Sequence, residues 1–160
     1  MLSITLICVG RMREKHYTAA FNEYEKRLGA FCRFSLVELP EQRLPERPAQ
    51  KEIDAALEKE ADAILAHVPK GAALVAMCVE GKTMPSEALA ERFLRWQNDG
   101  VSRLCFVVGG SFGLHPRVKQ TAQLKLSMSP MTFPHHLARV MLMEQIYRAF
   151  TINAGTQYHK

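Results

Sequence analysis

The chain alternates short apolar runs with longer segments whose apolar residues recur at helical spacing, and this alternation constrains the fold more than any other feature. Five runs have the length and composition of strands: Leu2–Val9, Phe31–Leu39, Ala73–Val79, Arg103–Val108 and Leu124–Met128. The first lacks strict apolar–polar alternation, which is typical of a strand buried on both faces. Strands separated by helices predict an α/β fold with a mostly parallel sheet flanked by helices.

The intervening segments carry the expected helix signals. Helices are predicted from Arg13 to Gly29, over Lys51–His67, from Ser86 as N-cap toward Gly100, from Pro116, and over His135–Phe150. Glu80-Gly81-Lys82 is expected to turn away from the third strand, and Asn153–Lys160 is expected to be a tail. Pro40, Pro45 and Pro48 break the chain inside a charged loop.

The length of 160 residues predicts one domain over residues 1–160, because no linker-like stretch divides the chain. No apolar run approaches the roughly 20 residues that a membrane-spanning helix needs. The start also lacks the basic and small-residue features of a signal peptide. We therefore expect a cytoplasmic protein that does not enter a membrane.

Positive charge is concentrated toward the end of the sequence. The net charge is +5, and the last sixty residues carry seven Lys and Arg side chains against one acid, Glu144. This distribution predicts that an anionic partner meets the C-terminal part of the chain.

The cysteines and histidines do not form a metal-binding pattern. Cys8, Cys32, Cys78 and Cys105 contain no C-x-x-C pair, and three of them fall inside apolar runs. His135 and His136 are adjacent in sequence, so they do not face one metal together on a helix. We expect buried thiols that pack as small hydrophobes, and no metal site.

The last helix is apolar on almost every side. Leu137, Val140 and Met141 lie on one side of it, and Leu142 and Ile146 lie on the other. A helix of this kind needs cover on two sides. One side can face the sheet, and the other is covered either by the same domain or by a second subunit, which favours a homodimer.

Three loops that follow predicted strands define a candidate ligand site: Cys78–Lys82, Gly109–Gly113 and Ser129–Pro134. In an open parallel sheet, ligands bind beyond the carboxyl ends of the strands. The run Gly109-Gly110-Ser111-Phe112-Gly113 matches neither a dinucleotide fingerprint nor a P-loop, so alone it is either a tight turn or a cofactor loop. No arrangement for nucleophilic hydrolysis is present.

Longer motifs carry a more specific signal. They are the strand and loop Leu104–Leu114, the run Leu126–His135, the helical segment Arg139–Ala149 and the terminal Tyr158-His159-Lys160. In this order and spacing, together with Val9-Gly10 and Tyr24–Arg27 near the start, they resemble the ribosomal RNA large subunit methyltransferase H family. These SPOUT-class enzymes methylate N3 of a pseudouridine in 23S ribosomal RNA with S-adenosylmethionine. The resemblance covers essentially the whole chain.

The resemblance implies a homodimer of small subunits, each with a trefoil knot in its C-terminal half and no separate RNA-binding domain. The net charge of only +5 and the lack of an RNA-binding extension suggest weak binding to naked RNA, so we expect the substrate to be a folded surface of the assembled ribosome that both subunits touch. The cofactor-binding residues that the resemblance implies are Met77, Gly109, Met128, Ser129, Pro130, Met131, Thr132 and Phe133. The substrate-binding residues it suggests are His135, Arg139, Tyr158 and His159, with Glu144 as a further candidate for the proton acceptor. Tyr158 and Arg139 are expected to offer surfaces on which a base can stack.

The chain departs from the family pattern at two places. Cys78 stands where the family often has Asp, and Ser111-Phe112 occupies a position that is commonly small or acidic. Three other functions stay open at this stage. They are a SPOUT methyltransferase of another RNA position (ribose 2′-oxygen or transfer RNA), a non-catalytic ribosome-binding module, and a generic nucleotide-binding α/β domain.

Overall fold

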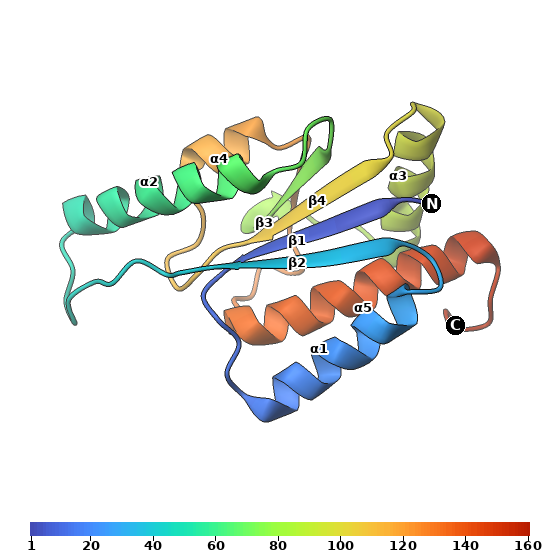
Figure 1. The fold of residues 1–160 in the computed structure, drawn as a ribbon, viewed down its shortest axis with the longest axis horizontal. Helices are drawn as coiled ribbons and strands as arrows, with labels where there is room; N and C mark the ends of the chain where they lie inside the picture. Colours follow the sequence, from blue (N-terminus) through green and yellow to red (C-terminus); the bar gives the residue numbers. More distant parts are fainter.

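The computed structural model describes residues 1–160 and contains one five-stranded sheet in the order β2-β1-β4-β3-β5 (Figure 1). The strands are β1 (Ser3–Val9), β2 (Arg33–Leu39), β3 (Ala73–Lys82), β4 (Arg103–Val108) and β5 (Leu124–Leu126). Every pair of neighbouring strands is parallel, which confirms the predicted α/β architecture.

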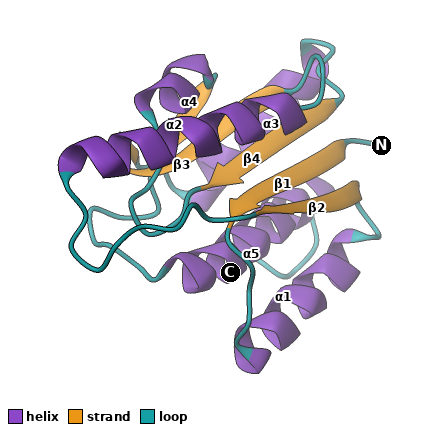
Figure 2. Ribbon diagram, turned by 60° about the vertical axis from the view of Figure 1, so that its left-hand side comes forward, coloured by secondary structure: helices purple, strands orange, loops and turns teal.

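Helices cover both faces of the sheet, so the molecule has three layers. They are α1 (Lys15–Leu28), α2 (Gln50–His67), α3 (Ser86–Asn98), α4 (Pro116–Thr121) and α5 (His135–Ala154). Helices α2 and α4 lie over one face, whereas α1, α3 and α5 lie over the other (Figures 1 and 2). No helix is both long and apolar enough to cross a membrane.

The central strands are buried on both sides, as predicted. Successive side chains of a strand point to opposite faces of the sheet. In β1, Ile4 and Leu6 pack into the core under α1, α3 and α5, whereas Ile7 and Val9 pack into the core under α2 and α4. This double burial explains why the first run lacks strict apolar–polar alternation.

Several element boundaries differ from the expectation; β5, for example, ends at Leu126 and not at Met128. Strand β3 continues through Glu80-Gly81 to Lys82, because its register against β5 shifts between Met77 and Lys82. Ser86 is the first residue of α3 and not its N-cap, and its hydroxyl donates to Gln145 Oε1 at 2.6 Å.

Helix α5 also runs beyond its expected end, to Ala154. Gly155 ends it with φ +70°, a left-handed conformation that glycine adopts without strain. Asn153, expected to lie in a tail, instead donates from its side-chain amide to Ala90 O at 2.9 Å.

The parallel arrangement brings the carboxyl ends of all five strands to one edge of the sheet. Val9 at the end of β1 lies opposite Leu39 at the end of β2, and Cys8 lies opposite Val108 at the end of β4. The loops that leave these strands therefore meet at that edge, where a ligand site is expected.

Candidate functional site

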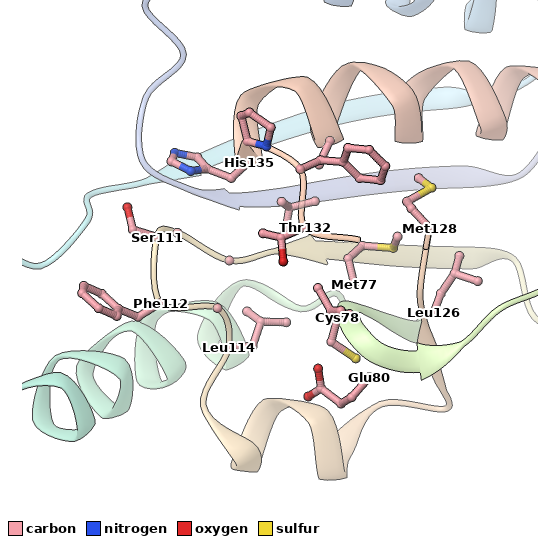
Figure 3. Close-up of a pocket in the computed structure, with 18 of the residues that line it drawn as sticks. Met77, Cys78, Glu80, Ser111, Phe112, Leu114, Leu126, Met128, Thr132 and His135 are labelled. Atoms are coloured by element: carbon pink, nitrogen blue, oxygen red, sulfur yellow. The ribbon is translucent and has the colours of Figure 1, made fainter. Parts of the chain in front are cut away.

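A cavity of about 580 Å³ lies at the carboxyl edge, which is within the usual size range of small-molecule sites. It is formed by the last part of β3, by the glycine loop (residues 109–113) and by the segment between β5 and α5 (Figure 3). These are the three loops that the sequence predicted. Of the eight predicted cofactor-binding residues, seven line the cavity: Met77, Gly109, Met128, Ser129, Met131, Thr132 and Phe133. Pro130 lies outside the lining.

The glycine loop folds back tightly on itself. Gly110 and Gly113 form an isolated antiparallel bridge, and Gly113 has φ +79°. A Cβ atom at Gly109 would stand 2.5 Å from Gly113 O, a distance that real Cβ atoms do not reach. The glycine loop can therefore close on itself only because residue 109 has no side chain.

Glu41, which the sequence analysis missed, supports the glycine loop from outside. It follows β2, and its Oε1 accepts a hydrogen bond from the backbone N–H of Ser111 at 3.1 Å. The same oxygen would stand 2.6 Å from a Cβ at Gly110. The strand-end rule points to this residue, because β2 ends at the same edge as β3 and β4.

Replacement of Glu41 by Ala is expected to loosen the glycine loop without unfolding the protein. A hydrogen bond of this kind contributes about 1 kcal/mol, so cofactor affinity should fall by roughly fivefold. Calorimetric titration of the variant with S-adenosylmethionine measures this change. Glu46→Ala, in the same exposed loop but without a recorded hydrogen bond or salt bridge, is the matched control. Equal affinities of the two variants would contradict the supporting role of Glu41.

The segment between β5 and α5 is held by its own serines. Ser127 Oγ donates to Ser129 O at 3.0 Å, and Ser129 Oγ accepts from the backbone N–H of Met131 at 3.0 Å. Figure 3 shows Thr132 between the glycine loop and the pair Met77 and Cys78. These bonds replace the sheet and helix pairing that Pro130 and Pro134 prevent.

Cys78 differs from the other three cysteines because it is only half-buried and lines the cavity. Burial, and after it the charge of Glu80, raises the pKa of its thiol, so Cys78 stays protonated and is a poor nucleophile. Glu80 is itself paired with Lys119. Cys8, Cys32 and Cys105 are buried, and burial raises the pKa of each to about 12, as expected for packing residues.

His135 is the one candidate proton acceptor that lines the cavity. Burial, followed by the neighbouring charges of His136 and Arg139, lowers the pKa of its imidazole. A lowered pKa keeps His135 neutral at physiological pH, and a neutral imidazole has a free nitrogen that accepts a proton. His136 faces another way and pairs with Glu14 at 2.7 Å.

Arg139 lies beside the cavity but is buried, with 1% of its surface exposed. Its Nη2 donates to Val9 O at 2.9 Å and to Gly10 O at 2.8 Å, and its Nη1 donates to Glu38 at 3.2 Å. The guanidinium has no exposed plane, so the expectation that a base stacks on Arg139 is wrong for this structure. Arg139 instead fixes the end of β1 to α5.

The remaining candidates lie together at a different place. Tyr158 donates to Glu144 Oε1 at 3.1 Å, and its ring packs on Tyr147 with centroids 4.8 Å apart. His159 contacts Glu87 and Arg148, and Arg148 forms an i, i+4 salt bridge with Glu144. Burial raises the pKa of Tyr158 to about 12, so its hydroxyl stays protonated. The terminal residues are therefore packed on α3 and α5 and do not reach the cavity of their own chain.

The charge of the last sixty residues is largely neutralised, contrary to the expectation of a positive local field. Four of their seven cations are paired with acids: Arg117 with Asp62, Lys119 with Glu80, Arg139 with Glu38 and Arg148 with Glu144. Three of these acids, Glu38, Asp62 and Glu80, lie outside the last sixty residues. A charge count over those sixty residues alone therefore does not include them.

No group of three or more His, Cys, Asp or Glu side chains is placed to hold a metal ion. The cavity instead offers mixed apolar side chains and exposed backbone around a glycine loop. Such a lining suits an organic ligand with a flat heterocycle and a polar chain.

Comparison with known proteins agrees with this geometry. A family model described as "Predicted SPOUT methyltransferase" matches residues 2–159. A protein of Bifidobacterium animalis subsp. lactis (strain AD011) named "Ribosomal RNA large subunit methyltransferase H" is 46% identical over 159 residues, which is 99% of this chain and 100% of the relative.

Two solved structures share the fold at low sequence identity. A probable methylase family protein from Haemophilus influenzae Rd KW20 matches with a TM-score of 0.55 and 12% identity over 98% of this chain and 70% of its own. A probable methyltransferase from Bordetella pertussis Tohama I matches with a TM-score of 0.57 and 14% identity over 92% and 95%. Since the family model covers nearly every residue and a curated relative aligns over the full length, the chain belongs to the SPOUT methyltransferase family.

Proposed function

We propose that this protein transfers a methyl group from S-adenosylmethionine to N3 of a pseudouridine in 23S ribosomal RNA, on the assembled ribosome in the cytoplasm. The observation that carries the proposal is the glycine-loop cavity at the carboxyl edge, in a chain that aligns end to end with a named ribosomal RNA methyltransferase. The pseudouridine target itself rests on the family resemblance of the motifs around residues 104–160.

The residues around the cavity fit the proposed cofactor. The absence of a side chain at Gly109 lets the glycine loop keep the closed shape that lines the cavity, because a Cβ there would collide with Gly113 O. Met77, Leu114 and Leu126 supply apolar walls for an adenine ring, and backbone groups of residues 128–133 supply polar partners for the amino-acid part. When bound, S-adenosylmethionine supplies an electrophilic methyl group on a sulfonium centre.

The chain's own residues have two tasks in this reaction. The three loops hold the reactants in line, which accounts for much of the rate of a displacement reaction. The N3 atom of pseudouridine also carries a proton that must leave, and neutral His135 at the cavity is placed to accept it.

The rate of methyl transfer is expected to fall in acid, where His135 becomes protonated. From neutral pH upward His135 is neutral, so its titration should not affect the rate. The lowered pKa places protonation of His135 below its ordinary range, so the base is lost only as pH falls through that value. His135→Gln should slow methyl transfer by about 10²-fold, the usual contribution of a general base, and remove this acidic inflection. Single-turnover rates from pH 5 to 8 measure both effects, with replacement of the exposed His16 on α1 by Gln as the control. A wild-type profile in His135→Gln would refute the role.

The proposed active unit is a homodimer, with the knotted C-terminal half that the family implies. A second cavity of about 490 Å³ lies between α1, α3 and α5 and shares Leu126 and Met128 with the first. Val140, Met141 and Glu144 of α5 line it, and all three are only half-buried.

Deletion of Tyr158–Lys160 is expected to abolish most methyl transfer while the protein stays folded and dimeric. In the free chain these residues contact α3 and α5 only at the surface, so their loss should cost about 1 kcal/mol or less of stability. Size-exclusion chromatography with light scattering and a methylation assay test the two halves of this statement. A truncated dimer with full activity would show that the terminal residues take no part.

Transfer of labelled methyl groups to purified substrates tests the proposed function. We expect incorporation into large ribosomal subunits from a strain that lacks the protein, and much less into protein-free 23S RNA, because a small single domain gains affinity from a preformed ribosomal surface. Incorporation into transfer RNA or at a ribose 2′-oxygen would instead identify another SPOUT activity. Absence of any S-adenosylmethionine binding would point to the non-catalytic module, and tight mononucleotide binding alone to a generic nucleotide-binding domain.

A further inference from the structure

Four arginines near the cavity lack the acidic partners that neutralise the C-terminal cations. Arg11 and Arg13 lie between β1 and α1, and Arg43 and Arg47 lie between β2 and α2; all four are exposed and none forms a salt bridge. We call these four residues the arginine edge. Free positive charge at this end of the molecule is therefore also present in the N-terminal part of the sequence.

The two loops that carry the arginine edge begin side by side at the cavity end of the sheet. Gly10 N donates to Leu39 O at 2.7 Å, and the backbone N–H of Met12 donates to Glu38 at 2.9 Å. Glu41 then joins the second loop to Ser111 in the glycine loop. Figure 2 shows both loops leaving the same ends of β1 and β2. The arginine edge thus continues the rim of the cavity.

The acids of these loops are mostly occupied by other partners. Glu14 pairs with His136, Glu38 with Arg139, and Glu41 with the Ser111 amide, which leaves Glu46 as the one acid without a partner. Pro40, Pro45 and Pro48 restrict the second loop, so less conformational entropy is lost when its arginines bind. Guanidinium groups bind phosphate oxygens with two parallel hydrogen bonds.

We propose that the arginine edge binds phosphates of the ribosomal RNA strand that flanks the target base, and so places that base over the cavity. This inference rests on the proposed function for the identity of the polyanion. Phosphate contacts position a nucleic acid without reading its sequence, which suits an enzyme that acts on one site of a folded particle.

The test compares two fourfold variants in binding and turnover. Arg11, Arg13, Arg43 and Arg47 are each replaced by Gln in the first. The control replaces four exposed, unpaired cations elsewhere by Gln: Lys26 on α1, Lys59 on α2, and Arg33 and Lys70 at the opposite ends of the strands. Both variants lose the same charge, so a difference between them reports position and not net charge.

The arginine-edge variant should raise KM for large ribosomal subunits by at least tenfold with kcat little changed. It should also reduce the slope of log affinity against log salt, measured with 23S RNA fragments, by up to about 3, since each contact to single-stranded RNA contributes about 0.7. Its S-adenosylmethionine affinity should match wild type, which shows that the cavity is intact. Equal KM and equal salt slopes in the two variants would overturn the proposal.

The same data separate this inference from the proposed function. If the wild-type protein does not methylate ribosomal RNA, the methylation reaction is refuted. If the salt slope of RNA binding is nevertheless reduced only in the arginine-edge variant, the phosphate-binding surface is still supported. Methylation by both variants with wild-type KM would support the reaction and refute the surface.

Discussion

Gly109→Ala is expected to weaken S-adenosylmethionine binding by about 10- to 100-fold. The added Cβ would stand 2.5 Å from Gly113 O and 2.6 Å from Gly113 C, so backbone and not a flexible side chain must move. Overpacking of this kind costs about 1–3 kcal/mol, and each 1.4 kcal/mol is tenfold in affinity. The loop that moves is the one that lines the cavity, so the cost falls on the ligand-binding conformation.

Calorimetric titration measures the loss, and circular dichroism shows whether the fold is kept. Gly29→Ala is the control, because Gly29 has helical φ and its added Cβ would lie 3.2 Å from Lys26 O, away from the cavity. Wild-type affinity in Gly109→Ala would show that the glycine loop does not hold the cofactor. A substitution at Gly113 would act differently: nothing lies within 4 Å of a Cβ there, so only the φ of +79° resists a side chain.

Arg139→Ala should destabilise the protein by about 3–5 kcal/mol, the usual cost of breaking a buried ion pair. The substitution would leave the carbonyls of Val9 and Gly10 without this donor, and the carboxylate of Glu38 with only the backbone N–H of Met12. Arg139→Lys keeps the charge but cannot reach three acceptors from one ammonium, so an intermediate loss is expected.

Urea unfolding measures both variants, with a fitted midpoint and slope for each. Arg95→Ala is the matched control, because the Arg95–Glu91 pair lies on the surface with more than half of each side chain exposed, and such pairs contribute less than about 1 kcal/mol. A loss of under 1 kcal/mol in Arg139→Ala would contradict the assigned structural role. Unchanged stability together with a loss of RNA affinity would also contradict this role, and would indicate that Arg139 binds the substrate.

The sequence predicted the layers of the fold because each strand is bounded by glycine, proline or charge. It did not predict the extension of β3 to Lys82, since the register shift against β5 depends on a pairing between distant segments. It misplaced Ser86 because a serine after proline has the signature of an N-cap, whereas here the hydroxyl is drawn to Gln145 on α5. Local propensity cannot weigh such a tertiary hydrogen bond.

For the candidate site, the sequence predicted the position of the cavity but not all of the contacts that support it. The three loops followed from the rule that ligands bind beyond the carboxyl ends of strands, and the cavity lies there. The burial of Arg139 and the support from Glu41 could not be predicted, because both depend on which loops touch across more than 60 positions of sequence. For the same reason the sequence could not show that four of the seven cations in the last sixty residues are paired with acids, whereas Arg11, Arg13, Arg43 and Arg47 are exposed and unpaired.

The most direct test of the central claim is mass spectrometry of 23S ribosomal RNA from a strain that lacks this protein. We predict that one N3-methylpseudouridine becomes pseudouridine, that the wild-type gene restores the methyl group, and that Gly109→Ala restores little of it. An unchanged set of methylated nucleosides in 23S RNA from the deletion strain would contradict the proposed reaction.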